Sequence, residues 1–151
     1  MAEHRSSVEI AAAPDRVFDY LITADGITAW MGDWARVEPT PGGEFSVNIA
    51  GYGARGIFLE VDRPRRVIVS WGFEGSLTLP PGSSTVSFEL SATARGTHVE
   101  VVHTDLPEGE VAGHIDGWEH FIARLAGAVT GHTLPVDDWA PSPGPTPNTK
   151  E

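Results

Sequence analysis

The chain has 151 residues, of which 40% are hydrophobic and 21% charged, and its formal net charge is -11. This length suits one domain, no apolar run approaches the roughly 20 residues of a membrane helix, and the lack of cysteine excludes disulfides, thiol nucleophiles and cysteine-ligated metals. Nucleic acid is not an expected partner, because the negative charge would repel a phosphate backbone.

The first part of the chain predicts one strand followed by two short helices. Val8 and Ile10 alternate with polar neighbours, which predicts a strand over residues 5–12. Pro14 stands at a helix-opening position, where its missing N–H donor costs nothing. The apolar residues of one helical face then follow: Val17, Phe18, Leu21 and Ile22. The triplet Ala-Asp-Gly at 24–26 is expected to break this helix before a second short one toward Trp30.

A succession of strand patterns separated by turn residues comes next, which is typical of an antiparallel sheet. About seven strands are expected in all. Alternation along these strands points the following side chains toward one face: Phe45, Val47, Ile57, Leu59, Val69, Trp71, Phe88, Val101 and His103. The basic cluster of Arg63, Arg65 and Arg66 brackets Pro64 between two strands and is interpreted as a turn.

The last third of the chain changes to a helical period. From Glu110, apolar residues recur at three and four positions over about 20 residues, which predicts a long helix covering the sheet. Residues 133–151 are rich in proline, interspersed with serine, threonine and glycine, and have too little apolar surface to offset the entropy of ordering. We therefore expect one domain over 1–132 and a disordered tail over 133–151. The element order predicts an α+β fold, a curved antiparallel sheet of six to seven strands around a long C-terminal helix.

Several short motifs stand in a fixed order between residues 7 and 130. They are Ile10-Ala11-Ala12-Ala13-Pro14, Trp30, Pro41-Gly42-Gly43, Gly56 with Glu60-Val61-Asp62-Arg63-Pro64, Val101-Val102-His103 and Gly117-Trp118. In this order they resemble the START-like (SRPBCC, Bet v 1-like) superfamily, in the branch named for the activator of Hsp90 ATPase. The resemblance implies a helix-grip fold with a cavity between the sheet and the C-terminal helix. It leaves function open, because this superfamily hosts binders, cyclases, transfer proteins and co-chaperones on one scaffold.

Under this resemblance, large inward side chains are expected to line a ligand cavity. The candidates are Trp30, Phe45, Val47, Leu59, Val69, Trp71, Phe88, Val101, His103, His114, Trp118 and Phe121. Rigid aromatic rings can wall a pocket without collapsing it, although the same residues can equally fill a solid core. His103 and His114 can orient a carbonyl, phenol or carboxylate of a ligand, or can serve as satisfied core histidines.

No catalytic residue, metal or cofactor is predicted. Two histidines without a placed third ligand fall short of a catalytic zinc set. The sequence also shows no nucleophile elbow and no glycine-rich phosphate loop of recognised spacing. Residues 1–7 are polar and lead directly into a strand pattern without an apolar signal segment, so a cytoplasmic protein is expected.

The leading hypothesis is a binder of a hydrophobic small molecule, such as an aromatic or polyketide-like metabolite. Its purpose would be sequestration, self-protection as in antibiotic producers, transport or sensing. A second hypothesis is a cyclase or dehydratase that uses His103 or His114 as acid or base in the same pocket. A third, implied by the resemblance, is a co-chaperone-like interaction with an Hsp90-type ATPase. The sequence leaves monomer and homodimer equally open.

Overall fold

The computed structural model describes residues 2–132 and 134, and these form seven strands and three helices. In chain order they are β1 (Ala2–Ile10), α1 (Pro14–Ile22), α2 (Ala24–Thr28), β2 (Trp34–Val37), β3 (Glu44–Ile49), β4 (Tyr52–Asp62), β5 (Arg66–Trp71), β6 (Ser84–Thr93), β7 (Gly96–Leu106) and α3 (Glu108–Val129). None of the helices in this part of the chain is long and apolar enough to span a membrane. Apart from Leu134, the tail predicted over 133–151 lies outside the described residues.

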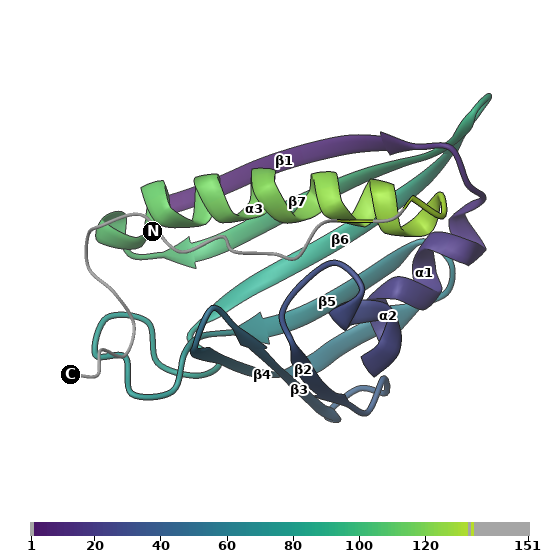
Figure 1. The fold of residues 1–151 in the computed structure, drawn as a ribbon. Coiled ribbons are helices and arrows are strands. Elements are labelled where there is room, and N and C mark those ends of the chain that lie inside the picture. Colours follow the sequence, from purple (N-terminus) through teal and green to yellow (C-terminus); the bar gives the residue numbers. More distant parts are fainter. Residues whose placement is uncertain (1, 133, 135–151) are drawn as a thin grey trace.

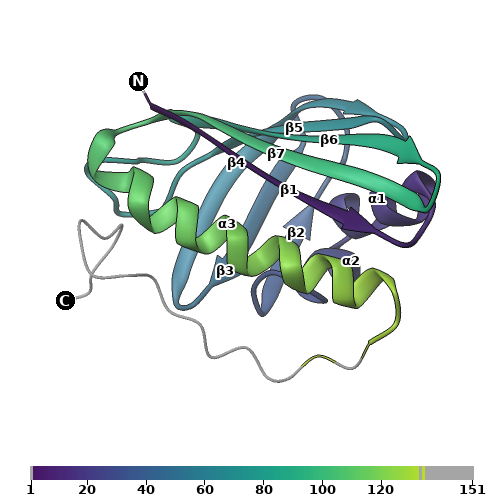
Figure 2. The same cartoon turned by 90° about the horizontal axis from the view of Figure 1, so that it is seen from above.

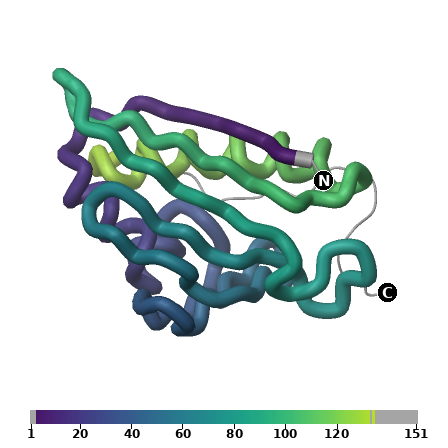
Figure 3. Tube along the Cα trace, turned by 180° about the vertical axis from the view of Figure 1, so that it is seen from behind, coloured from purple at the N-terminus to yellow at the C-terminus, as the bar shows by residue number. Residues whose placement is uncertain are grey.

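All seven strands belong to one antiparallel sheet in the order β1-β7-β6-β5-β4-β3-β2. The sheet curves around α3, which runs along β1 (Figures 1 and 2). The hairpin of β6 and β7 projects beyond the ends of the neighbouring strands (Figure 3). The predicted α+β fold, with two short early helices and a long C-terminal helix on a curved antiparallel sheet, is confirmed.

Thr23 separates the two short helices. Its backbone is extended, and its Oγ1 accepts a hydrogen bond of 2.9 Å from the Gly26 N–H, the usual arrangement of a helix N-cap. The second helix therefore begins at Ala24. The prediction that residues 24–26 break the helix is wrong, because the break lies at Thr23 and these residues form the first turn of α2. Trp30 follows α2 and is buried, with its indole N–H donating to the Tyr20 carbonyl at 2.9 Å.

In strand β4, a β-bulge interrupts the regular alternation of inward and outward side chains. Phe58 is fully buried, but the register with β5 slips between Phe58 and Glu60, so that Val61 also packs against the core. Ile57 and Leu59 consequently lie on the outer face, 42% and 45% exposed. The prediction that Ile57 and Leu59 face the helix is wrong. If the alternation ran regularly back from the inward Val61, Leu59 would also point inward. The bulge inserts one extra residue between Phe58 and Val61, so Leu59 points outward.

The basic turn between β4 and β5 is neutralised by ion pairs. Arg63 contacts Asp15 at 2.9 Å and Asp19 at 2.6 Å, which ties this turn to α1. Arg65 and Arg66 also lie within ion-pair distance of acidic neighbours. The three arginines thus serve local structure, in agreement with their interpretation as a turn.

Candidate ligand-binding site

A row of buried aromatic rings lies between the inward face of the sheet and α3. Ring centroids are 6.1 Å apart for Phe45 and Trp71, 5.4 Å for Trp71 and Trp118, 5.7 Å for Trp118 and Phe88, and 6.3 Å for Phe88 and Trp30. The structure brings ten candidates together, each at most 4% exposed: Trp30, Phe45, Val47, Val69, Trp71, Phe88, Val101, His103, Trp118 and Phe121. His114 joins them from α3, whereas Leu59 lies on the opposite face of the sheet.

His103 is fully buried, and both of its ring nitrogens have hydrogen-bond partners. Its Nδ1 accepts from the Trp118 indole N–H at 3.0 Å, and its Nε2 lies 2.8 Å from the Ser84 hydroxyl. That hydroxyl donates to the Trp71 carbonyl at 2.8 Å, so its oxygen is left to accept from His103. These contacts together require a neutral imidazole with its proton on Nε2.

Burial supports the same protonation state. Desolvation lowers the pKa of His103 well below its usual 6.5, and the neighbouring His114 and His4 lower it further. Protonation at Nδ1 would also leave the Trp118 N–H without an acceptor. His103 is therefore a satisfied core histidine rather than a group ready to exchange protons.

His114 lies on α3 at the edge of this cluster, with 10% of its side chain exposed. Its Nδ1 is 2.8 Å from the Glu110 carbonyl, which can only accept, and its Nε2 accepts from the Trp71 indole N–H at 3.3 Å. This imidazole therefore carries its proton on Nδ1. Desolvation lowers its pKa, although the hydrogen bond to the Glu110 carbonyl opposes that effect.

Three polar residues of this region were missed by sequence reasoning. Ser84 bonds to His103, and Thr78 donates to the buried carboxyl of Glu110 at 2.7 Å. Glu110, His114 and Trp118 stand four residues apart, which places them on one face of a helix. This spacing is a signal that could have identified Glu110. Nothing comparable in the sequence identifies Ser84 or Thr78, which lie at the start of β6 and in the loop before it.

A separate groove lies between the edge strand β1 and α3. It has a volume of about 400 Å³, is open to solvent, and is lined by Arg5, Ser6, Ser7, Val8, Glu119, Ile122 and Ala123. None of these residues belongs to the candidate site.

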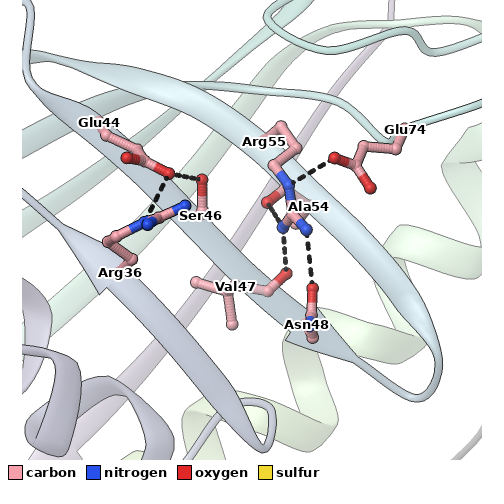
Figure 4. A network of polar contacts seen from close by, with 8 residues as sticks. All are labelled: Arg36, Glu44, Ser46, Val47, Asn48, Ala54, Arg55 and Glu74. Atoms are coloured by element: carbon pink, nitrogen blue, oxygen red, sulfur yellow. Dashed lines mark hydrogen bonds and ion pairs between the residues drawn. The ribbon is translucent and has the colours of Figure 1, made fainter.

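The outer face of β2, β3 and β4 carries a polar network (Figure 4). Arg55 donates to the Asn48 side chain at 2.9 Å and to Glu74 at 3.0 Å, and Arg36 contacts Glu44 at 3.3 Å. The exposed Trp34 ring lies near both guanidinium groups, at 5.5 Å from Arg36 and 5.6 Å from Arg55. This network braces the sheet edge on the face that points away from α3.

Comparison with known proteins places the chain in one family. The family described as Activator of Hsp90 ATPase homolog 1-like protein matches residues 11–130. Comparison with the curated proteins gives no match. The chain is similar to the AHSA1-like protein RHE_CH02687 from Rhizobium etli, with 38% identity over 92% of this chain and 89% of that one and a TM-score of 0.73.

Two further solved structures share the fold at lower identity. The Aha1 dimer from Colwellia psychrerythraea is 19% identical over 85% of this chain and 96% of that one, with a TM-score of 0.76. DynU16, described as a putative protein in the dynemicin biosynthetic locus, is 22% identical over 91% of this chain and 56% of its own, with a TM-score of 0.74. With the family match and the Rhizobium relative, the helix-grip architecture makes this chain a member of the Activator of Hsp90 ATPase homolog 1-like family, within the START-like superfamily.

Proposed function

We propose that the protein binds a hydrophobic small molecule, aromatic or polyketide-like, between the inward face of the sheet and α3, for sequestration, self-protection, transport or sensing. The observation that carries this proposal is the row of aromatic rings with two neutral histidines beside its central members, Trp71 and Trp118. Such an arrangement offers apolar contact along its length and a few fixed polar groups near its middle, and ligand pockets commonly combine these two features.

Ligand entry requires movement of α3. The Trp71 and Trp118 rings contact each other at a centroid distance of 5.4 Å, so a ligand cannot lie between them in this conformation. The first half of α3 is intrinsically weak. Its N-cap is Pro107, which makes no side-chain capping bond, and Gly109, Gly113 and Gly117 follow. Gly113 and Gly117, in the helix interior, each cost about 1 kcal/mol relative to alanine, which favours local opening of this half.

The description of one structural relative supports the proposal. DynU16 is described as belonging to the dynemicin biosynthetic locus, and its fold matches this chain. A protein encoded beside a biosynthetic route can meet the product or an intermediate of that route. We extend this role to the present chain on the combined basis of shared fold and aromatic interior.

The test is native mass spectrometry of the protein purified from its own host, followed by release and identification of any adduct. We expect a stoichiometric hydrophobic adduct on the wild-type protein and on the control Leu77→Ser, because Leu77 is 98% exposed. Trp118→Leu should lose the adduct, since it removes a central ring of the row. A clean apo mass for the wild type, also after incubation with host extract, contradicts the proposal.

A second candidate function is interaction with an Hsp90-type ATPase, favoured by the family match itself. A pull-down with the host chaperone tests it, and recovery of no chaperone refutes it. The cyclase hypothesis has less support, because all four ring nitrogens of His103 and His114 already have hydrogen-bond partners. If it holds, His114→Gln abolishes turnover while ligand binding is retained.

A further inference from the structure

The hydrogen bond between Trp71 and His114 is the weakest point of the buried polar cluster. Its length from Trp71 Nε1 to His114 Nε2 is 3.3 Å, whereas the bonds of His103 to Ser84 and Trp118 measure 2.8 and 3.0 Å. It is also nearer to solvent than the two His103 bonds, because the His114 side chain is only partly buried whereas His103 is fully buried. A molecule entering beside α3 would therefore break this contact before the two bonds of His103.

Opening this bond exposes one donor and one acceptor side by side. The Trp71 indole can only donate. The Nε2 of His114 can only accept, because its Nδ1 proton is held by the Glu110 carbonyl 2.8 Å away. A ligand that satisfies both groups must accept one hydrogen bond and donate another from the same place. A hydroxyl group does this with a single oxygen.

Other polar groups fit this pair less well. An ether or ketone oxygen accepts from Trp71 but leaves His114 Nε2 buried without a donor, which is costly. A carboxylate would place two acceptors against Nε2 and bring a negative charge toward the buried carboxyl of Glu110, whose Oε1 is 3.9 Å from His114 Nδ1. The flanking surface is aromatic, with the Phe73 ring 5.7 Å from Trp71 and 5.8 Å from His114.

We propose that the site selects an uncharged aromatic ligand carrying a hydroxyl group, which inserts between Trp71 Nε1 and His114 Nε2. The hydroxyl oxygen accepts from the indole N–H, and its proton is donated to the imidazole. This inference rests on the proposed ligand-binding function and adds to it the chemical class of the ligand.

The test compares 2-naphthol, 2-methoxynaphthalene and 2-naphthoate by calorimetric titration of the full chain. We expect 2-naphthol to bind about tenfold more tightly than the methoxy compound, since the latter leaves a buried acceptor unpaired, and 2-naphthoate to bind most weakly. In ¹⁵N-labelled protein, 2-naphthol should shift the Trp71 indole signal, which is assigned as the one missing from Trp71→Phe.

Two variants separate the hydroxyl contact from simple apolar binding. His114→Phe keeps an aromatic ring but removes the acceptor, so the advantage of 2-naphthol should fall to about twofold or less. His98→Phe, on the exposed side of β7, is the matched control and should keep the full advantage. If His114→Phe does not fold, Trp71→Phe tests the donor side: 2-naphthol and 2-methoxynaphthalene should both bind more weakly with their ratio kept, because both accept from the indole N–H, and unchanged affinities would overturn the contact.

The outcomes distinguish selection of a hydroxyl group from hydrophobic ligand binding in general. Equal affinity for 2-naphthol and 2-methoxynaphthalene in the wild type overturns the hydroxyl selection but leaves hydrophobic binding standing. Tightest binding of 2-naphthoate overturns it as well, because the site would then favour an anion. Binding of none of the three overturns the selection together with the aromatic binding on which it rests.

Discussion

The buried imidazole of His103 should make stability depend on pH in a predictable direction. In the folded protein its pKa lies well below 6.5, mainly because burial disfavours the charged form, and in the unfolded chain it returns to about 6.5. Below that pH the unfolded state binds a proton that the folded state does not. Stability from this group is therefore complete above about pH 6.5 and is lost as the pH falls toward the folded pKa.

The size of the effect follows from proton linkage. If His103 stays neutral in the folded protein down to pH 5.0, the free energy of unfolding falls by about 2 kcal/mol between pH 7.5 and 5.0 through this group alone. His114 and His4, whose pKa values are also lowered, act in the same direction. Because other groups titrate in this range too, the contribution of His103 must be obtained by comparing the wild type with a variant that lacks this imidazole.

The variant His103→Gln provides that comparison. Glutamine carries an acceptor oxygen and a donor NH₂ group, so it can replace both hydrogen bonds of the neutral imidazole, but it does not titrate. Urea unfolding of both proteins at pH 7.5 and 5.0 should show the wild type losing about 2 kcal/mol more than the variant over this interval. The same loss in both proteins would refute the assignment of a neutral, permanently bonded His103.

Three further changes test local features by urea unfolding. Gly113→Ala should raise the free energy of unfolding by about 0.5–1 kcal/mol, because an added Cβ meets no atom within 4 Å; a loss of stability would contradict the weak first half of α3. Phe58→Ala should cost about 3–5 kcal/mol and Leu59→Ala no more than about 0.5, and equal costs would contradict the bulge. Thr78→Val should cost about 1–3 kcal/mol by removing the donor to Glu110, whereas Thr78→Ser should be nearly neutral; equal losses would assign the effect to packing.

The architecture could be predicted from periodicity because each buried face here repeats regularly. Trp71, Phe88, Val101 and His103 alternate along straight strands, and their inward orientation follows from that alternation. Leu59 shows the limit of the argument. A bulge adds one residue to a strand without a distinct sequence signal. Residues before the bulge therefore alternate with the opposite parity to residues after it.

The chemistry of the site could be predicted only in part. The sequence indicates that His103 and His114 point inward, but their protonation depends on partners that converge from distant segments. Ser84 begins β6 and Trp118 lies on α3, and only the folded chain brings them to the two nitrogens of His103. The contact between Trp71 and Trp118 likewise depends on how closely α3 approaches the sheet. The positions of residues along the sequence do not determine that distance.

The electrostatic character of the molecule narrows the ligand class further. The net charge of -11 opposes the approach of anions, and the candidate site offers them no cation once they arrive, because both histidines are held neutral. Among the described residues, the buried carboxyl of this region is Glu110, which lies in the first turn of α3 and accepts a hydrogen bond from the Thr78 hydroxyl at 2.7 Å. A carboxylate ligand would have to share that position with the Glu110 carboxyl. A neutral molecule with an apolar body and a single hydroxyl avoids these conflicts, so the net charge of the protein and the donor–acceptor pair of Trp71 and His114 favour the same ligand.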